Sequence, residues 1–224
     1  MRGRETVWRL VTIAEMQGRD LLRRRSALLM LAAMPIAFYF ALLGKGVAAI
    51  TTGGVGMAFS VSGAALFSML AARRIEPRLV LAGYRPLELL LGRLLLLEAL
   101  GIAIVAVTSG LISIVSAPAR PDLVFAGIAL TVWVAVPLGL AIATVIAREL
   151  EGVLAAIAVV GVQLSLPIDS AAAPFLPLYG PLRILSRVGG ASGGLVGGLA
   201  GGLAYGVVLS AVAVVSWRLR LRMR

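Results

Sequence analysis

Six long apolar runs, separated by short polar or proline-containing breaks, follow one another along this 224-residue chain. A run of about 20 apolar residues is long enough for a helix to cross a bilayer, and the ~10-residue alternating segments of a membrane β-barrel are absent. The pattern therefore predicts an all-α, polytopic membrane protein with six transmembrane helices. The expected spans are residues 27–43, 55–72, 87–115, 123–147, 153–166 and 195–217.

The breaks between the runs predict how the spans are joined. Glycines at 44 and 46 should end the first span, and the sequence Thr-Thr-Gly-Gly at 51–54 is typical of a turn before the second. Residues 148–152 are expected to form a tight charged turn. Residues 167–188 carry four prolines among apolar residues, which favours short, broken or re-entrant helices between the fifth and sixth spans over a solvated loop.

The chain begins with a different pattern, in which apolar residues recur at helical spacing on one side of residues 5–25. We expect this arm to be an amphipathic helix lying in the membrane interface; a solvated basic tail is the alternative. Three acid–arginine pairs have the favourable i,i+4 order: Glu5–Arg9, Glu15–Arg19 and Asp20–Arg24. The expected organisation is a single transmembrane domain over 1–224, made of the arm (1–26), the six-span bundle (27–217) and a basic cytoplasmic tail (218–224).

Charge orients the predicted bundle. Hydrophobic residues make up 60% of the chain, which still carries a net charge of +11. On the six-span interpretation, seventeen Lys and Arg residues fall on the side of both termini, and the other side holds only Lys45, Arg120, Arg183 and Arg187. The positive-inside rule places both termini in the cytoplasm of a plasma membrane and accounts for the charge without nucleic acid. If the short fifth segment did not cross the membrane, the chain would have five spans and its C-terminal arginines would lie outside the cell.

Composition removes most catalytic chemistry. The chain contains neither cysteine nor histidine, so it has no disulfide, no thiolate or imidazole metal site and no Ser/His or Cys/His nucleophile. A phosphate-binding loop ending at Gly44-Lys45 would need glycine at position 39, where the chain has Tyr39. We therefore expect neither an enzyme nor a metal protein, and any energy for work must come from a partner.

Two polar residues inside the predicted spans could carry function. Glu98 lies about ten residues into the third span, roughly 15 Å deep, where a carboxylate must pair, protonate or face water. It is a candidate for a substrate path, with a structural hydrogen bond as the alternative. Gln163 in the fifth span is a second path candidate, for which an interhelical hydrogen bond is the favoured alternative.

Glycines recur in pairs every four residues from 189 to 202. Small residues at i,i+4 allow another helix to approach closely, so Gly194, Gly198 and Gly202 are candidate packing positions, against this chain or a second copy. A flexible low-complexity segment is the alternative for residues 189–194.

The segment from 73 to 93 is the internal one with the most charges, and most of them are arginines. Pro77 suits a first helical turn and Gly83 a helix end, so residues 77–83 are predicted to form a short helix between the second and third spans. Its positive charge is consistent with simple retention in the cytoplasm or with docking of a soluble partner.

Taken together, these features resemble the membrane (permease) subunit of an ATP-binding-cassette exporter of the type-2 permease kind. The resemblance rests on the arm ending in Arg23-Arg24-Arg25, the six spans, and the pattern Glu76-x-Arg78-Leu79-x-Leu81-x-Gly83-x-Arg85-Pro86 leading to Gly92-Arg93. The segment Pro177-Leu178-Tyr179-Gly180-Pro181 fits the short outer helices of that family. Pro77 and Arg78 stand where the family commonly has a glycine-rich turn.

The resemblance implies a role for the basic segment. In that family the loop between spans two and three contacts the ATPase, which makes a set of residues here candidates for coupling: Glu76, Arg78, Leu79, Leu81, Gly83, Tyr84 and Arg85. It also implies a bacterial multi-pass protein that works with a second permease copy or paralogue and with nucleotide-binding subunits that hold ATP and Mg²⁺. The apolar path suits a hydrophobic, lipid-like or drug-like substrate. The alternatives are an ATP-independent secondary transporter centred on Glu98, or a non-transporting scaffold that binds through the glycine strip.

Overall fold

The computed structural model describes residues 12–13, 15–19, 25–73, 75–146, 148–190 and 194–222. Over these residues the chain is all-helical, with no strand, which confirms the predicted fold class at that level. The elements are α2 (Arg25–Ala41), α3 (Val47–Ala72), α4 (Glu76–Leu81), α5 (Pro86–Ser116), α6 (Pro121–Val145), α7 (Glu149–Ser165), the 3-10 helix η1 (Ala173–Phe175), α8 (Tyr179–Leu185) and α9 (Leu195–Arg222).

Within the described ranges, four helices are long and apolar enough to cross a membrane: α3, α5, α6 and α9. The expected first and fifth spans correspond to α2 and α7, which have 17 residues each. At 1.5 Å per residue such a helix is about 26 Å long, slightly less than a ~30 Å hydrocarbon core. The structure is therefore compatible with a multi-pass membrane protein and gives four candidate spans, and six crossings remain a prediction.

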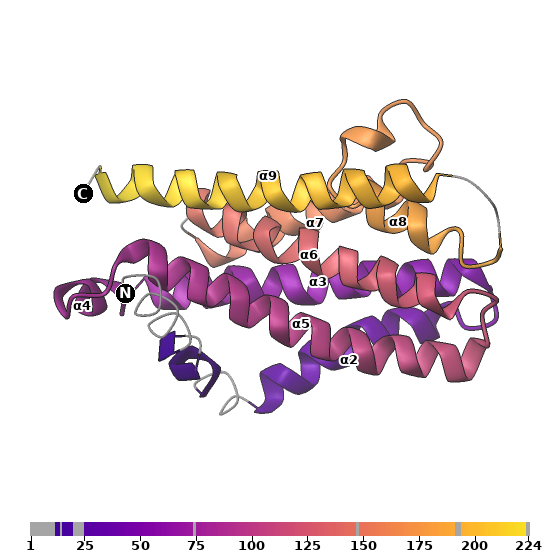
Figure 1. The fold of residues 1–224 in the computed structure, drawn as a ribbon, viewed down its shortest axis with the longest axis horizontal. Helices are drawn as coiled ribbons and strands as arrows, with labels where there is room; N and C mark the ends of the chain where they lie inside the picture. Colours follow the sequence, from indigo (N-terminus) through magenta and orange to yellow (C-terminus); the bar gives the residue numbers. More distant parts are fainter. Residues whose placement is uncertain are drawn as a thin grey trace, which may run out of the picture.

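The helices form an elongated bundle around α6, which packs against α3, α5, α7, α8 and α9 (Figure 1). Between residues 127 and 141 of α6 only Ala129 and Trp133 are partly exposed, and all the others are buried. α4 and the C-terminal end of α9 lie at one end of the bundle, whereas α8 and η1 lie at the opposite end. We call these the α4 end and the α8 end.

Glycines set the close helix crossings around α6. A Cβ on Gly139 would overlap the backbone oxygen of Ser62 in α3, and one on Gly101 of α5 would overlap the side chain of Val132. With no side chain in the way, the backbones approach closely enough for dense packing, which is the main source of helix association in a membrane.

The turn predicted at residues 51–54 is wrong, because these residues lie inside α3. The hydroxyl groups of Thr51 and Thr52 donate to the carbonyl oxygens of Val47 and Ala48, at 2.9 and 2.8 Å, as they can in a continuous helix. The neighbouring Gly54 serves packing, since a Cβ there would overlap Leu185. The chain instead reverses at 42–46, where Gly44 and Gly46 have positive φ angles of 87° and 59°.

The charged turn predicted at 148–152 is also shifted. Helix α6 ends at Val145, and α7 begins at Glu149 rather than at residue 153. Acidic residues in a first helical turn complement the helix dipole, and Glu151 accepts a 2.8 Å hydrogen bond from Arg148. Residues 218–222, expected as part of a tail, continue α9.

Candidate functional site

The predicted short helix between the second and third spans is α4, with Pro77 in its first turn. It ends where predicted: Gly83 has a φ of 93°, and the backbone N–H of Tyr84 donates to the Leu79 carbonyl at 3.1 Å. The next helix starts within three residues, because Pro86 begins α5 and the buried Glu88 accepts the backbone N–H of Arg85 at 3.4 Å. This arrangement fixes α4 as a compact projection between two long helices.

α4 exposes apolar side chains at the tip of the bundle, beyond the lateral surface that lipid would cover. Leu81 is 88% exposed, and Ile75 and Val80 are also exposed. Arg78 and Arg85 are exposed on either side, and Leu79 and Tyr84 are half-buried. An apolar patch with flanking arginines is typical of a surface that a protein partner covers. The side chain of Glu76 lies outside the described residues.

Two arginines tie this projection to the bundle. Arg73, at the end of α3, donates through Nη2 to the carbonyl oxygens of Ala143 and Ile146, the latter at 3.3 Å. A cation at these last carbonyls of α6 is favourable, because they lack helical partners and carry the negative end of the dipole. Arg93, only 4% exposed, places Nη1 2.9 Å from the sulfur of Met69 in α3. Arg73 thus links the end of α3 before α4 to α6, and Arg93 links α5 to α3.

The N-terminal arm is described only in part. Arg19 pairs with Glu15 at 2.7 Å, which confirms one of the three predicted i,i+4 pairs; the other two lie outside the described residues. Ile13 is fully buried, and a Cβ on Gly18 would lie 3.2 Å from Leu96 of α5. The described part of the arm thus packs on the flank of α5, near the α4 end.

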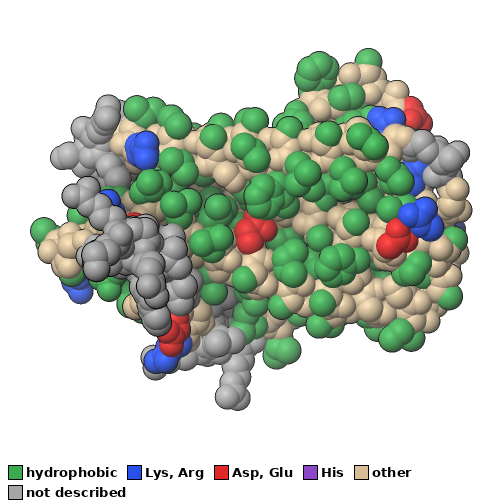
Figure 2. All heavy atoms as spheres, in the orientation of Figure 1, with side chains coloured by type: hydrophobic (Ala, Val, Ile, Leu, Met, Phe, Trp, Pro, Cys, Tyr) green, Lys and Arg blue, Asp and Glu red, His purple; other side chains and the backbone are tan. Residues whose placement is uncertain are grey.

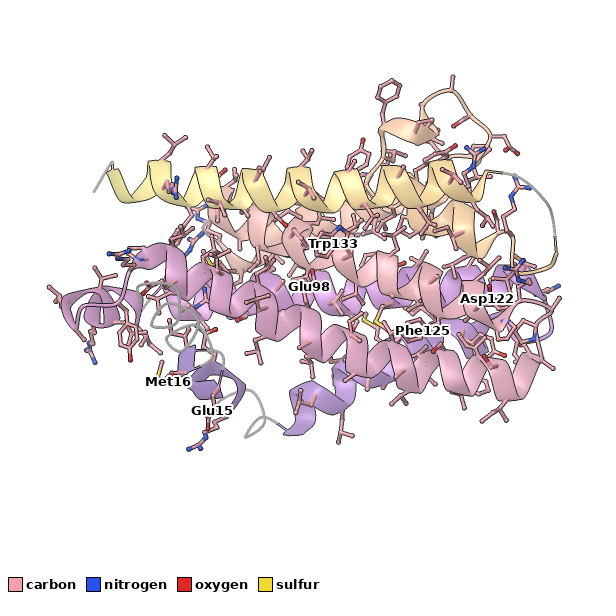
Figure 3. All side chains as sticks on the ribbon, in the orientation of Figure 1. Glu15, Met16, Glu98, Asp122, Phe125 and Trp133 are labelled. Carbon is pink, nitrogen blue, oxygen red and sulfur yellow. The ribbon has the colours of Figure 1, made fainter. Side chains whose placement is uncertain are left out.

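Glu98 lies on α5, twelve residues after the helix starts at Pro86. That distance is about 18 Å along the axis. Its Oε1 atom is buried without a hydrogen-bond partner in the described part of the chain. Figure 2 shows the acidic side chain in the middle of one lateral face, among apolar side chains, and Figure 3 labels it beside Trp133. A structural hydrogen bond was the alternative role predicted for Glu98, and its Oε1 atom makes no such bond in the described part of the chain.

A groove passes over α6 on the same face. Helices α5 and α9 both pack on α6 but hardly touch one another. The exposed stripe of α6 between them consists of residues three or four apart: Asp122, Phe125, Ala129 and Trp133. Further toward the α4 end, Val136 and Leu140 on the same stripe are buried. We call this exposed stripe, flanked by α5 and α9, the α6 groove; it runs from the α8 end to Trp133, its closed end.

The two ends of the groove differ in charge. At its open end Arg120 and Asp122 form a two-bonded ion pair, with N–O distances of 3.0 and 2.7 Å. The hydrogen bond to Asp122 raises the pKa of Arg120 above its ordinary value, so the guanidinium stays charged. At the closed end Gly101, one turn after Glu98, contacts Val132, the residue before Trp133. This contact places the carboxyl group and the indole on adjacent turns of facing helices.

Gln163 serves the segment that contains the prolines. It is 5% exposed, and its side-chain oxygen accepts the backbone N–H of Leu178 at 3.0 Å, just before α8. The two short helices of this segment, η1 and α8, agree with the broken helices predicted from its prolines. The bond anchors the segment to α7.

The glycine strip packs within the chain. Gly198 lies against Gly180 and Ile184 of α8, since a Cβ added there would lie 3.2 Å from the Gly180 carbonyl oxygen, and a Cβ on Gly202 would overlap Leu130 of α6. One turn on, a Cβ on Gly206 would overlap the Trp133 indole, whose Nε1 donates to the Leu203 carbonyl at 3.3 Å. Gly194 precedes the helix, has a φ of 75° and lies against Arg183.

Sequence reasoning missed Trp133 and the anchoring role of Arg73. Tryptophan favours the membrane interface, whereas Trp133 lies ten or more residues from either end of its expected span. This unusual position was a signal of a specific role that the sequence offered. Among the described residues no group of three or more acidic side chains could hold a metal ion. No model of a known protein family matches the chain, and no curated protein sequence matches it.

Proposed function

We propose that this chain is the permease subunit of an ATP-binding-cassette exporter of the type-2 permease kind. The observation that carries the proposal is α4: an apolar tip flanked by arginines, exposed at the end of the bundle and tied by Arg73 to the central helix. Such a projection suits a cleft on a nucleotide-binding subunit. That partner would hold ATP and Mg²⁺, and this chain itself would not be an enzyme.

In this proposal α2 and α7 complete six crossings, since 17 residues lie at the lower limit of a transmembrane helix. The distribution of cations supports the orientation. Described basic side chains at the α4 end are Arg73, Arg78, Arg85, Arg93, Arg148 and Arg218, and those at the α8 end are Lys45, Arg120, Arg183 and Arg187. With the N-terminal arginines added, the α4 end and both termini face the cytoplasm of a bacterial plasma membrane.

Coupling would use the contacts of Arg73 and Arg93. ATP-driven movement of the partner pushes α4, and the two arginines transmit the push to α3, α5 and α6. Two permease copies, identical or related, would then alternate between inward-open and outward-open states and export a hydrophobic, lipid-like or drug-like substrate. The residues of α4 and its C-terminal turn named from the resemblance, Arg78, Leu79, Leu81, Gly83, Tyr84 and Arg85, would form the contact, with Glu76 at its start.

A photo-crosslinking amino acid at Leu81 tests the contact in native membranes. The expected product is an adduct with a nucleotide-binding subunit, and the same probe at Phe175, 79% exposed in η1 at the α8 end, should give none. The purified chain alone should not hydrolyse ATP, whereas the complex should. Replacing both Arg78 and Tyr84 by alanine should leave hydrolysis by the complex but abolish transport. Adducts without any nucleotide-binding protein would contradict the proposal.

Glu98 supports a second candidate, an ATP-independent secondary transporter, because one of its oxygens is buried at mid-depth without a hydrogen bond among the described residues. This candidate requires transport by the purified chain in liposomes under a pH gradient, and loss of that transport in Glu98→Gln. The exporter requires the partner subunit and ATP under the same conditions. A reconstitution with and without ATP therefore separates the two.

A further inference from the structure

The closed end of the α6 groove combines features that recognise a particular kind of ligand. Glu98 comes to this end from α5. The partly exposed Trp133 comes from α6, with the N–H edge of its indole turned to Leu203 of α9, and the groove floor, Phe125 and Ala129, is apolar (Figures 2 and 3). A carboxylate attracts a cation, and the face of an indole is the best aromatic partner for one. Because these groups lie away from the headgroup regions, only a ligand that partitions into the bilayer would reach them laterally.

No cation of the described chain neutralises this carboxyl group. Glu98 forms none of the ion pairs found there, and its buried oxygen accepts no hydrogen bond. The nearest arginine along α5, Arg93, is buried and directed at Met69 of α3. Arg19 of the arm is paired with Glu15, and the remaining described basic side chains lie at the two ends of the bundle.

The shape of the groove fits an elongated amphiphile. From Asp122 to Trp133 the exposed stripe of α6 covers eleven residues, about 16 Å along the helix. The small side chain of Ala129 leaves room over the middle of the stripe. Beyond Trp133, the same side of α6 is buried. A cationic head at the closed end would leave its apolar part lying along the groove toward the α8 end. Phospholipid amines do not fit, since their headgroups stay at the membrane surface.

We propose that the α6 groove is a binding site for lipophilic organic cations, with Glu98 and Trp133 as the groups that recognise the positive charge. Binding requires only this chain in a bilayer. The conclusion that such cations are the transported substrates rests, in addition, on the proposed exporter function. The groove would then receive its ligand laterally from the membrane.

Tetraphenylphosphonium is a suitable probe, because its charge is permanent and its surface is apolar. Binding is measured by equilibrium dialysis to the purified chain in phosphatidylcholine nanodiscs, with empty nanodiscs as the background. We expect saturable binding that weakens about tenfold or more in Glu98→Gln, because one partner of a desolvated charge pair is removed. Glu149→Gln, the same substitution at the exposed start of α7 and outside the groove, should bind as the wild type does. Trp133→Leu should weaken binding, and Trp133→Phe should retain most of it.

Tetraphenylborate is an anion of the same shape, and its binding to the wild-type chain is compared with that of tetraphenylphosphonium. This comparison tests the proposal without any variant, so it does not depend on whether a variant folds. It should show no saturable binding above empty nanodiscs. Equal binding of the two ions, absence of tetraphenylphosphonium binding, or equal losses in Glu98→Gln and Glu149→Gln would each overturn the proposal. Since no ATPase is present, a positive result holds even if the exporter proposal fails, and a negative one leaves the crosslinking test at Leu81 intact.

Discussion

Replacing Gly139 by alanine should separate the two most closely packed helices of the bundle. Gly139 lies in α6 where it crosses α3, and an added Cβ would overlap the Ser62 carbonyl oxygen and lie 2.8 Å from the Ser62 carbonyl carbon and 2.9 Å from the Ala65 Cβ. The first two are backbone atoms, which cannot rotate out of the way as a side chain could. The methyl group is accommodated only if α3 and α6 move apart.

The loss of stability in Gly139→Ala is measured against a matched control, Gly110→Ala. Gly110 in α5 is also inside a helix, but a Cβ there would meet nothing within 4 Å. Both substitutions gain the same helix propensity, so the difference between them isolates the cost of overpacking, about 1–3 kcal/mol. For a chain of this length, each kcal/mol corresponds to roughly 2–4 °C in the unfolding midpoint.

The assay is thermal or denaturant unfolding of both purified variants in one detergent, beside the wild type. We expect Gly110→Ala to unfold at or slightly above the wild-type midpoint and Gly139→Ala to unfold several degrees below it. If the two midpoints coincide, the close α3–α6 crossing is wrong, and with it the central position of α6.

Three further changes test the anchors of the candidate sites with the same unfolding assay. Arg73→Ala should cost about 1–3 kcal/mol, because the last carbonyls of α6 lose their donor; an unchanged midpoint would contradict the anchor. Gln163→Leu should cost a similar amount by leaving the Leu178 N–H unpaired, and faster hydrogen exchange should appear at that amide. Gly202→Leu should destabilise the chain through overlap with Leu130, whereas Gly201→Leu, in open space, should not.

Local signals predicted the helices and several of their ends. Pro77 and Gly83 bound α4 as proline and glycine should. These signals depend on the residue itself, so a single sequence is enough to use them. The apolar runs likewise predicted an all-α membrane protein. The first and fifth expected spans, of 17 and 14 residues, were already the shortest, and the corresponding helices have 17 residues each.

Signals that depend on packing were misleading. Thr51-Thr52-Gly53-Gly54 has turn composition, but the hydroxyls bond within the helix and the glycines accommodate Tyr39 and Leu185. The local sequence alone does not distinguish a glycine that forms a turn from a glycine that lets another side chain pack closely against a helix. For the same reason the α6 groove was not foreseen, since it depends on α5 and α9 packing on α6 without meeting each other.

The central claim is that the α4 end faces the cytoplasm, where a nucleotide-binding subunit could reach it. The chain contains no cysteine, so Tyr84→Cys and Phe175→Cys each introduce a single thiol, one at each end of the bundle. An impermeant maleimide should label Phe175→Cys on intact cells and Tyr84→Cys only after the membrane is permeabilised. Labelling of Tyr84→Cys on intact cells would contradict the account.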